Sequence, residues 1–164
     1  MKVGFGYDSH RFEFCGSEKD SPQKLGGVEV LECPKLKGHS DADVLIHAII
    51  DAILGAAALG DIGSYFPDTD QRWENADSAK LLESVVDEVA EAGYVLGNID
   101  VTVVCEKPKI RPYADVMRAK LADILRVSVG SVSIKGKTNE GMGAIGEGQG
   151  IAAYAVVLID ENKN

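Results

Sequence analysis

One apolar run, residues 42–59, constrains what this chain can fold into more than any other stretch. The run is rich in Ala, Leu and Ile and contains no Pro, so it predicts a long helix. Asp41 is suited to cap the N-terminus of this helix, and Gly60 is suited to end it.

The polar residues of this predicted helix form a narrow stripe. Asp43, His47 and Asp51 recur every four residues and therefore share one face. A solvated helix face usually carries Lys and Glu, whereas here a histidine lies between two aspartates. The stripe is either a solvated face or a functional site. The helix alone does not decide between these alternatives, because a lone histidine on a helix is usually not a ligand.

Residues 2–8 alternate in character and predict a strand, with Val3, Phe5 and Tyr7 on one face and Gly4, Gly6 and Asp8 on the other. Continuing the alternation puts Asp8 and His10 on the same side. A carboxylate and an imidazole placed in this way can converge on a cation such as zinc, which takes three protein ligands in catalytic sites. The alternatives are an aspartate that only orients a histidine and an Asx motif in a turn.

The remaining periodic segments alternate between strands and helices. Strands are predicted at residues 25–31 (part of a short hairpin), 98–106, 131–135 and 151–159, and helices at residues 77–92 and 112–126. The last strand is apolar on both faces and should be central or buried against a subunit. With no internal repeat or linker, residues 1–164 are expected to form a single domain. The predicted fold class is an α/β (α+β) sandwich with helices packed on one face of a mixed β-sheet.

Composition narrows the class of function. A net charge of −9 argues against a non-specific nucleic-acid binder, and no apolar run is long enough for a membrane span. Met1 leads directly into a strand, so neither a signal nor a transit peptide is expected, and the expected location is cytoplasmic. Cys15, Cys33 and Cys105 are expected to be reduced thiols, although Cys15 and Cys33 could pair or bind metal.

Three loops carry polar groups that could bind an anion. Residues 60–63 and 66–70 are turns rich in carboxylates, which plain turn chemistry also explains. Residues 107–112 place three cations among prolines, as either a solvated loop or a phosphate contact. The glycine-dense stretch 136–150 lets backbone N–H groups approach an anion, and Glu140 within it is either a magnesium ligand or a surface carboxylate.

Four motifs, in this order, resemble a known family. They are the segment 6–10 (GYDSH), the stretch 39–70 that begins His-Ser-Asp, the segment 98–102 (NIDVT) and the loop with Thr138 and Glu140. Together they make nearly the whole chain similar to the 2-C-methyl-D-erythritol 2,4-cyclodiphosphate synthases of the non-mevalonate isoprenoid pathway.

The resemblance implies a reaction and its metals. The substrate would be a CDP-linked methylerythritol carrying a 2-phosphate, which attacks the β-phosphorus, closes a cyclic diphosphate and releases CMP. Asp8, His10 and His47 would hold one Zn²⁺ ion per active site. Glu140 would be the only protein ligand of a second divalent ion, Mg²⁺ or Mn²⁺.

The resemblance also implies roles for other residues and a homotrimer with active sites between subunits. His39 and Thr138 would stabilise the transition state. The substrate pocket would be lined by Ser40, Asp61, Ile62, Gly63, Phe66, Pro67, Asp68, Thr69 and Asp70. The cytidine and its phosphates would be held, from a neighbouring subunit, by Cys105, Lys107, Pro108, Lys109, Ile110 and Arg111. Lys137 and Asn139 are also expected to bind substrate.

Some features are open or depart from the family. Asp43 and Asp51, one helical turn either side of His47, are expected to orient its ring. Glu147 stands where the family often has an arginine that binds an anion in the trimer cavity, so regulation by such an anion is in doubt. The loop 15–24 is longer than the family pattern. A zinc-dependent phosphohydrolase and a binding protein with a structural metal are the competing functions.

Overall fold

A computed structural model describes residues 1–13 and 22–162. Its strands are β1 (Lys2–Arg11), β2 (Gln23–Leu25), β3 (Val28–Val30), β4 (Tyr94–Val104), β5 (Val132–Lys137) and β6 (Gly150–Glu161). Its helices are α1 (Val44–Ala57), α2 (Ile62–Tyr65), α3 (Ser78–Glu91), α4 (Ala114–Leu125) and α5 (Gly143–Gly146), with 3₁₀ turns η1 (Gln71–Trp73) and η2 (Val129–Ser131). Every strand and long helix predicted from the sequence is present, within a few residues at each end.

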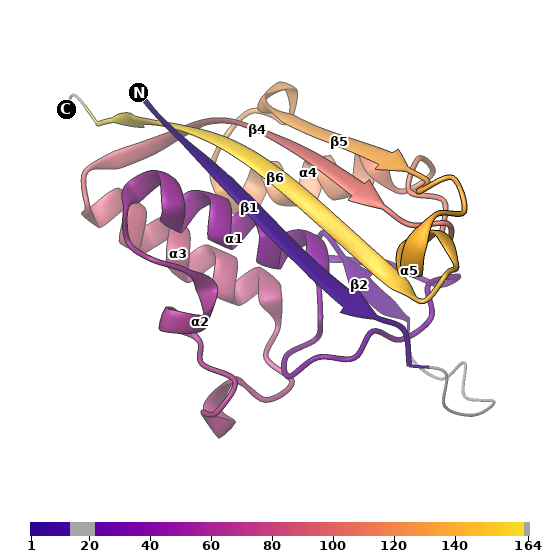
Figure 1. Ribbon diagram of the computed structural model, residues 1–164. Coiled ribbons are helices and arrows are strands. Elements are labelled where there is room, and N and C mark those ends of the chain that lie inside the picture. Colours follow the sequence, from indigo (N-terminus) through magenta and orange to yellow (C-terminus); the bar gives the residue numbers. More distant parts are fainter. Residues whose placement is uncertain (14–21, 163–164) are drawn as a thin grey trace.

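The main sheet is mixed and has the strand order β1-β6-β4-β5. β6 runs antiparallel to both of its neighbours, and β4 pairs with β5 in parallel. Figure 1 shows α1, α3 and α4 together on one face of this sheet, while β2 and β3 form a separate hairpin. The predicted mixed sheet with helices on one face is confirmed, and the apolar last strand is central, as its composition predicts.

Helix α1 lies at the centre of the core, and nearly all of its side chains are buried. Two predictions about its ends were wrong. The N-cap is Asp43 rather than Asp41, because Ala42 adopts a left-handed conformation (φ 54°) and the helix starts only after Asp43, whose side chain accepts a hydrogen bond from the Ile46 N–H at 3.1 Å. At the other end, Ala58 takes the left-handed C-terminal conformation, so the helix stops before Gly60.

Strand β1 approaches α1 through two glycines on its inner face. A Cβ at Gly4 would lie 1.8 Å from the carbonyl oxygen of Ala52, and one at Gly6 would lie 1.9 Å from that of Ala48. Because any side chain at these positions would overlap the helix backbone, only glycine permits this spacing. The strand therefore has its small residues inside and its large apolar residues outside.

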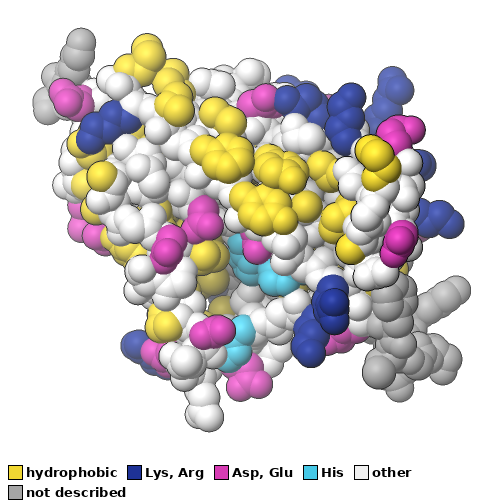
Figure 2. Space-filling view, in the orientation of Figure 1, with side chains coloured by type: hydrophobic (Ala, Val, Ile, Leu, Met, Phe, Trp, Pro, Cys, Tyr) yellow, Lys and Arg dark blue, Asp and Glu magenta, His cyan; other side chains and the backbone are white. Residues whose placement is uncertain are grey.

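The outer side of β1 and β6 carries an exposed apolar surface, made of Val3, Phe5, Tyr7, Tyr154 and Val156. We call it the exposed sheet face. Its aromatic rings touch one another, with the centroids of Tyr7 and Tyr154 separated by 5.1 Å. Figure 2 shows hydrophobic side chains gathered over these two strands. A contiguous exposed apolar patch of this kind often marks a site of interaction with another protein surface.

The cysteine and membrane predictions can be compared with the described residues. Cys33 and Cys105 are free and buried, whereas Cys15 and most of the loop 15–24 lie outside the described residues. Burial raises the pKa of the Cys33 thiol to about 12. Among the described helices, none is long and apolar enough to cross a membrane.

The close approach of β1 to α1 gives a stability prediction. Gly4→Ala should destabilise the protein by at least about 2 kcal/mol, because its methyl group must displace the helix backbone. Gly55→Ala, in α1, is the matched control: no atom of the described residues lies within 4 Å of its added Cβ, so it should stabilise by about 0.5–1 kcal/mol. Thermal unfolding at one protein concentration measures both; equal melting temperatures for wild type and Gly4→Ala would contradict the packing described here.

Candidate metal centre and its cavity

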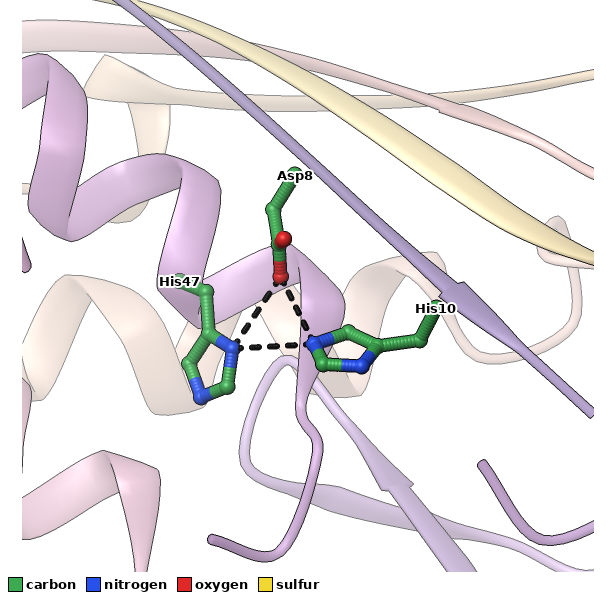
Figure 3. Close-up of side chains that lie close together, drawn as sticks. All are labelled: Asp8, His10 and His47. Carbon is green, nitrogen blue, oxygen red and sulfur yellow. Dashed lines mark hydrogen bonds and ion pairs between the residues drawn. The ribbon is translucent and has the colours of Figure 1, made fainter. Parts of the chain in front are cut away.

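Three ligand atoms from two elements converge at one point (Figure 3). Asp8 and His10 are two residues apart on the inner face of β1, and His47 lies in the first turns of α1. Asp8 Oδ2 lies 2.9 Å from His10 Nε2 and 3.0 Å from His47 Nδ1. The two ring nitrogens are 3.2 Å apart. The sequence-based grouping of these three residues is therefore matched by their positions.

The electrostatics of this triad favour a cation at its centre. Burial alone would raise the pKa of the Asp8 carboxyl, but hydrogen bonds with His10 and His47 lower that pKa well below its usual value. Burial alone would lower the pKa of His10, but the hydrogen bond and the charge of Asp8 raise it. The carboxylate is therefore held ionised between two imidazoles, and it attracts positive charge.

The donor set also fits a divalent metal ion in size and chemistry. Ligand atoms bound tetrahedrally at about 2.0–2.1 Å lie about 3.3–3.4 Å apart. The three atoms here are 2.9–3.2 Å apart, so a small outward shift would seat an ion. Two imidazole nitrogens and one carboxylate oxygen form a set that divalent transition metals accept.

The histidine ring of β1 is already oriented for this role. His10 Nδ1 lies 2.8 Å from the carbonyl oxygen of Lys37. A carbonyl only accepts, so Nδ1 carries a hydrogen and donates it; a metal ion that replaced the Nε2 hydrogen facing Asp8 would then meet the Nε2 lone pair at the centre of the triad.

A cavity of about 480 Å³ opens beside the triad. His39 lies in its wall, and His39 Nε2 is 3.3 Å from the carbonyl oxygen of Asp70. Six of the residues expected to line the substrate pocket lie in the same wall: Ser40, Ile62, Gly63, Phe66, Pro67 and Asp68. The cavity therefore joins the ends of α1 and α2 to the loop 66–68.

Three of the expected pocket residues have other positions. Asp61 caps α2, where its side chain accepts from the Ser64 N–H at 2.8 Å, and Asp70 caps η1 and pairs with Arg72. Neither they nor Thr69 are among the residues that line the cavity. The wall includes instead Trp73 and Leu81, which sequence reasoning missed. Trp73 is the only tryptophan of the chain and lies three residues after the predicted turn 66–70, which is a signal that could have found it.

A second, smaller cavity of about 140 Å³ lies between the basic loop and the end of β5. Its predicted members are Cys105, Pro108, Lys109, Ile110, Arg111, Lys137 and Thr138, and Gly136 joins them. Lys107 and Asn139 do not line it. Glu140 is exposed and accepts a hydrogen bond from Thr138 Oγ1 at 2.6 Å. The two cavities share no lining residue, so within one chain these residues are not brought to the metal triad.

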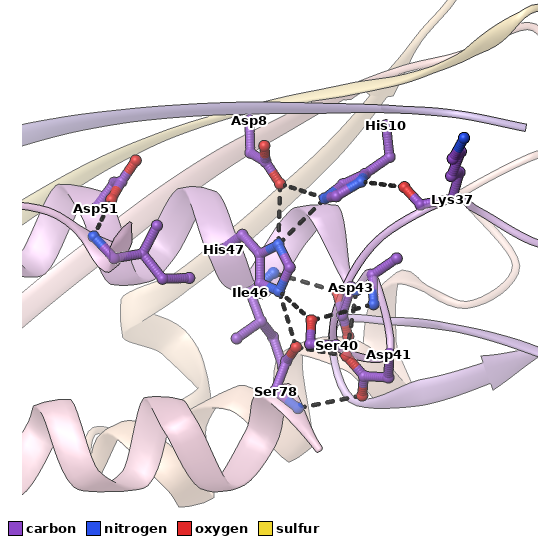
Figure 4. Close-up of polar contacts among 12 residues, drawn as sticks. Asp8, His10, Lys37, Ser40, Asp41, Asp43, Ile46, His47, Asp51 and Ser78 are labelled. Atoms are coloured by element: carbon purple, nitrogen blue, oxygen red, sulfur yellow. Dashed lines mark hydrogen bonds and ion pairs between the residues drawn. The ribbon is translucent and has the colours of Figure 1, made fainter. Parts of the chain in front are cut away.

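The expectation that Asp43 and Asp51 orient His47 was wrong (Figure 4). The Asp43 oxygens accept from backbone N–H groups of the β2–β3 turn and of the first turn of α1, at 2.7–3.1 Å. Asp51 accepts from the backbone N–H of Ile62 at 2.8 Å. The far nitrogen of His47, Nε2, meets two serine hydroxyls instead, at 3.1 Å from Ser40 and 3.0 Å from Ser78.

The model of the YgbB family matches residues 1–160. The chain belongs to this family. It is 49% identical over 164 residues to the 2-C-methyl-D-erythritol 2,4-cyclodiphosphate synthase of Lachnospira eligens, covering 100% of this chain and 87% of that one. It is 53% identical over 159 residues to the synthase of the same name from Symbiobacterium thermophilum, covering 97% and 98% of the two chains.

Solved structures share the fold over nearly the whole chain. The bifunctional IspDF from Campylobacter jejuni matches with a TM-score of 0.90 and 39% identity, over 98% of this chain and 42% of that longer one. The CDP complex of IspF from Plasmodium falciparum matches with a TM-score of 0.84 and 32% identity, over 99% and 97%. The YgbB fold of this chain is thus established by sequence and by structure.

The triad gives a metal-content prediction. Asp8→Asn removes the carboxylate of the triad, so a divalent metal ion offered to the protein should bind this variant more weakly. The loss of affinity should exceed the about 10- to 100-fold that follows removal of a hydrogen-bond partner behind a ligand. Asp87→Asn is the control, because this exposed carboxylate of α3 pairs with Arg126 at the end of α4, away from the triad. Elemental analysis after dialysis measures the retained metal. Equal metal content in Asp8→Asn and wild type would show that the ion is held elsewhere.

Proposed function

We propose that this chain converts 4-diphosphocytidyl-2-C-methyl-D-erythritol 2-phosphate into 2-C-methyl-D-erythritol 2,4-cyclodiphosphate with release of CMP. It would thus be a phosphorus–oxygen lyase of isoprenoid biosynthesis. Two full-length relatives carry the name of the synthase for this product, and one solved relative is a CDP complex. The observation that carries the proposal is the Asp8–His10–His47 triad at the edge of a cavity large enough for a small phosphorylated polyol.

The reaction balances without water. An oxygen of the 2-phosphate forms a bond to the β-phosphorus, the bond between that phosphorus and the bridging oxygen breaks, and the electron pair leaves with CMP. Phosphoryl transfer of this kind depends on positioning and on neutralising charge, so it needs no nucleophilic side chain. The alternative, a zinc-dependent phosphohydrolase, would add water and open the chain.

We propose that the triad holds Zn²⁺. Two imidazoles and a carboxylate leave a tetrahedral ion one position, which suits a catalytic rather than a structural site. When bound, the ion would act as a Lewis acid on phosphate oxygens. His39 and Ser40 lie in the wall of the same cavity, where they can contact the reacting phosphates.

The second cavity is proposed to hold the cytidine diphosphate part of the substrate. Lys109, Arg111 and Lys137 lie in its wall and supply positive charge for a diphosphate. Thr138 lines this cavity and donates to Glu140; Thr138 would stabilise the transition state and Glu140 would ligate a second ion, Mg²⁺ or Mn²⁺.

Because the two cavities are separate on one chain, we propose that each active site combines the triad of one subunit with the cytidine cavity of the next, in a homotrimer. A ring of three identical subunits repeats such a head-to-tail contact three times. The exposed sheet face supports this assembly, since Phe5, Tyr7 and Tyr154 offer apolar area for subunit contact.

Partners and location follow from the same proposal. The partners are the CDP-linked substrate, the CMP product and two copies of the chain, without nucleic acid or membrane. Cys33 and Cys105 are free thiols, which fits work in the reducing cytoplasm. Glu147 accepts from Gln149 Nε2 at 2.9 Å, and its negative charge disfavours an anionic regulator at that position.

Phosphorus NMR of the purified protein with the CDP-linked substrate, zinc and magnesium tests the reaction. Formation of CMP together with the cyclic diphosphate is expected, and His47→Ala should lose at least about 100-fold in rate because the metal centre is broken. CMP accompanied by an open-chain phosphate would identify a hydrolase instead.

Subunit complementation tests the shared site. His47→Ala and Lys109→Ala should each be nearly inactive alone, because each damages one half of every active site. Random exchange of subunits should restore about one quarter of wild-type activity, since one site in four then has both halves intact. If exchange is verified by native mass spectrometry and activity stays at the level of the single variants, the site lies within one subunit.

A further inference from the structure

The strongest observation outside the roles described so far is a buried polar chain behind His47 (Figure 4). Ser78 is the first residue of α3 and its side chain is completely buried. Its hydroxyl lies 3.0 Å from His47 Nε2 on one side and 2.5 Å from Asp41 Oδ1 on the other. We propose that Asp41 and Ser78 act as a relay that fixes the tautomer of His47 and thereby sets how tightly the chain holds its metal. The proposal rests on the proposed metal centre.

The direction of each hydrogen bond follows from the groups present. An ionised carboxylate can only accept. Asp41 accepts twice from Ser78, through Oδ1 from the hydroxyl and through Oδ2 from the backbone N–H at 3.1 Å. The single hydroxyl hydrogen of Ser78 is therefore directed at Asp41, and only its lone pairs face the histidine.

The tautomer of His47 follows from that arrangement. Its Nε2 therefore carries a hydrogen and donates it to Ser78, so that the Nδ1 lone pair is available to a metal ion that replaces the hydrogen shared with Asp8. That Nδ1 is the atom lying 3.0 Å from Asp8 Oδ2 and 3.2 Å from His10 Nε2. The opposite tautomer would bring the lone pairs of Nε2 and Ser78 together and place a hydrogen where the metal belongs.

Ser40 does not replace Ser78 in this role. Its hydroxyl oxygen is 3.1 Å from the same nitrogen but also accepts from the Ala42 N–H at 3.3 Å, and the residue lines the cavity where substrate would bind. Ser78 does not line that cavity. The buried serine can therefore keep its contact with His47 whatever occupies the cavity.

The relay also gives the two histidines different supports. His10 donates to a neutral carbonyl, that of Lys37, whereas His47 donates to a hydroxyl backed by a carboxylate. Partners that accept from the far nitrogen make an imidazole a stronger ligand, and a charged partner does so more than a neutral one. His47 should therefore be the histidine whose binding strength depends most on its surroundings.

The experiment is a zinc titration of the full-length protein against a chromophoric chelator of known affinity. Ser78→Ala should weaken zinc binding about 10- to 100-fold. Ser128→Ala is the matched control, because that exposed hydroxyl lies 3.1 Å from the Ser131 hydroxyl and far from the triad in sequence and fold, and the variant should bind zinc like wild type. His47→Ala separates this test from the metal centre itself: if it binds zinc as tightly as wild type, the centre is wrong and not only the relay.

A spectroscopic readout separates positioning from a loss of packing. In the zinc-loaded protein with ¹⁵N-labelled histidine, the His47 Nε2–H proton should appear far downfield, and it should move upfield in Ser78→Ala. Asp41→Asn keeps the size of the side chain and removes the charge, so it should weaken zinc binding less and shift the same signal in the same direction. If Ser78→Ala does not fold, Asp41→Asn alone tests whether the relay affects zinc binding. Wild-type zinc affinity and an unmoved signal in a folded variant would overturn the proposal.

Discussion

The contact on which this structure depends is the close approach of β1 to α1. Gly4 and Gly6 have no side chain to hold the helix away, and the carbonyl groups of Ala52 and Ala48 occupy the space where a Cβ would lie. Farther along the same face of the strand, the glycines give way to Asp8 and His10. The spacing set by the glycines is what lets these short side chains reach His47 across the gap.

Charge explains how an acidic chain can act on a substrate rich in phosphate. The net charge is −9, so positive charge has to be gathered locally. In the proposed enzyme it comes from metal ions and from Lys109, Arg111 and Lys137. The triad is partly buried, and the lower dielectric there strengthens charge interactions at the metal centre relative to water. Combining the two cavities across a subunit contact would also exclude water from the reacting phosphates.

The sequence predicted those features that depend on the local spacing of polar and apolar residues. Alternation placed Asp8 and His10 on one face, and the four-residue repeat placed His47 on a helix, but only the family resemblance grouped the three residues as metal ligands. The spacing of polar residues along a helix shows which of them share a face, but not which other elements pack against that face. Asp43 accepts hydrogen bonds from the β2–β3 turn, and Asp51 accepts one from the first residue of α2. The hydroxyl partner of His47 is Ser78, the first residue of α3. Trp73 and Leu81 entered the cavity wall for the same non-local reason.

The most direct test of the account is anomalous X-ray diffraction at the zinc absorption edge, from crystals of the zinc-loaded protein. The account predicts one strong peak per chain, about 2.0–2.2 Å from Asp8 Oδ2, His10 Nε2 and His47 Nδ1, with an open side toward the cavity. A peak bonded to His47 Nε2, or one lying away from these three residues, would contradict it.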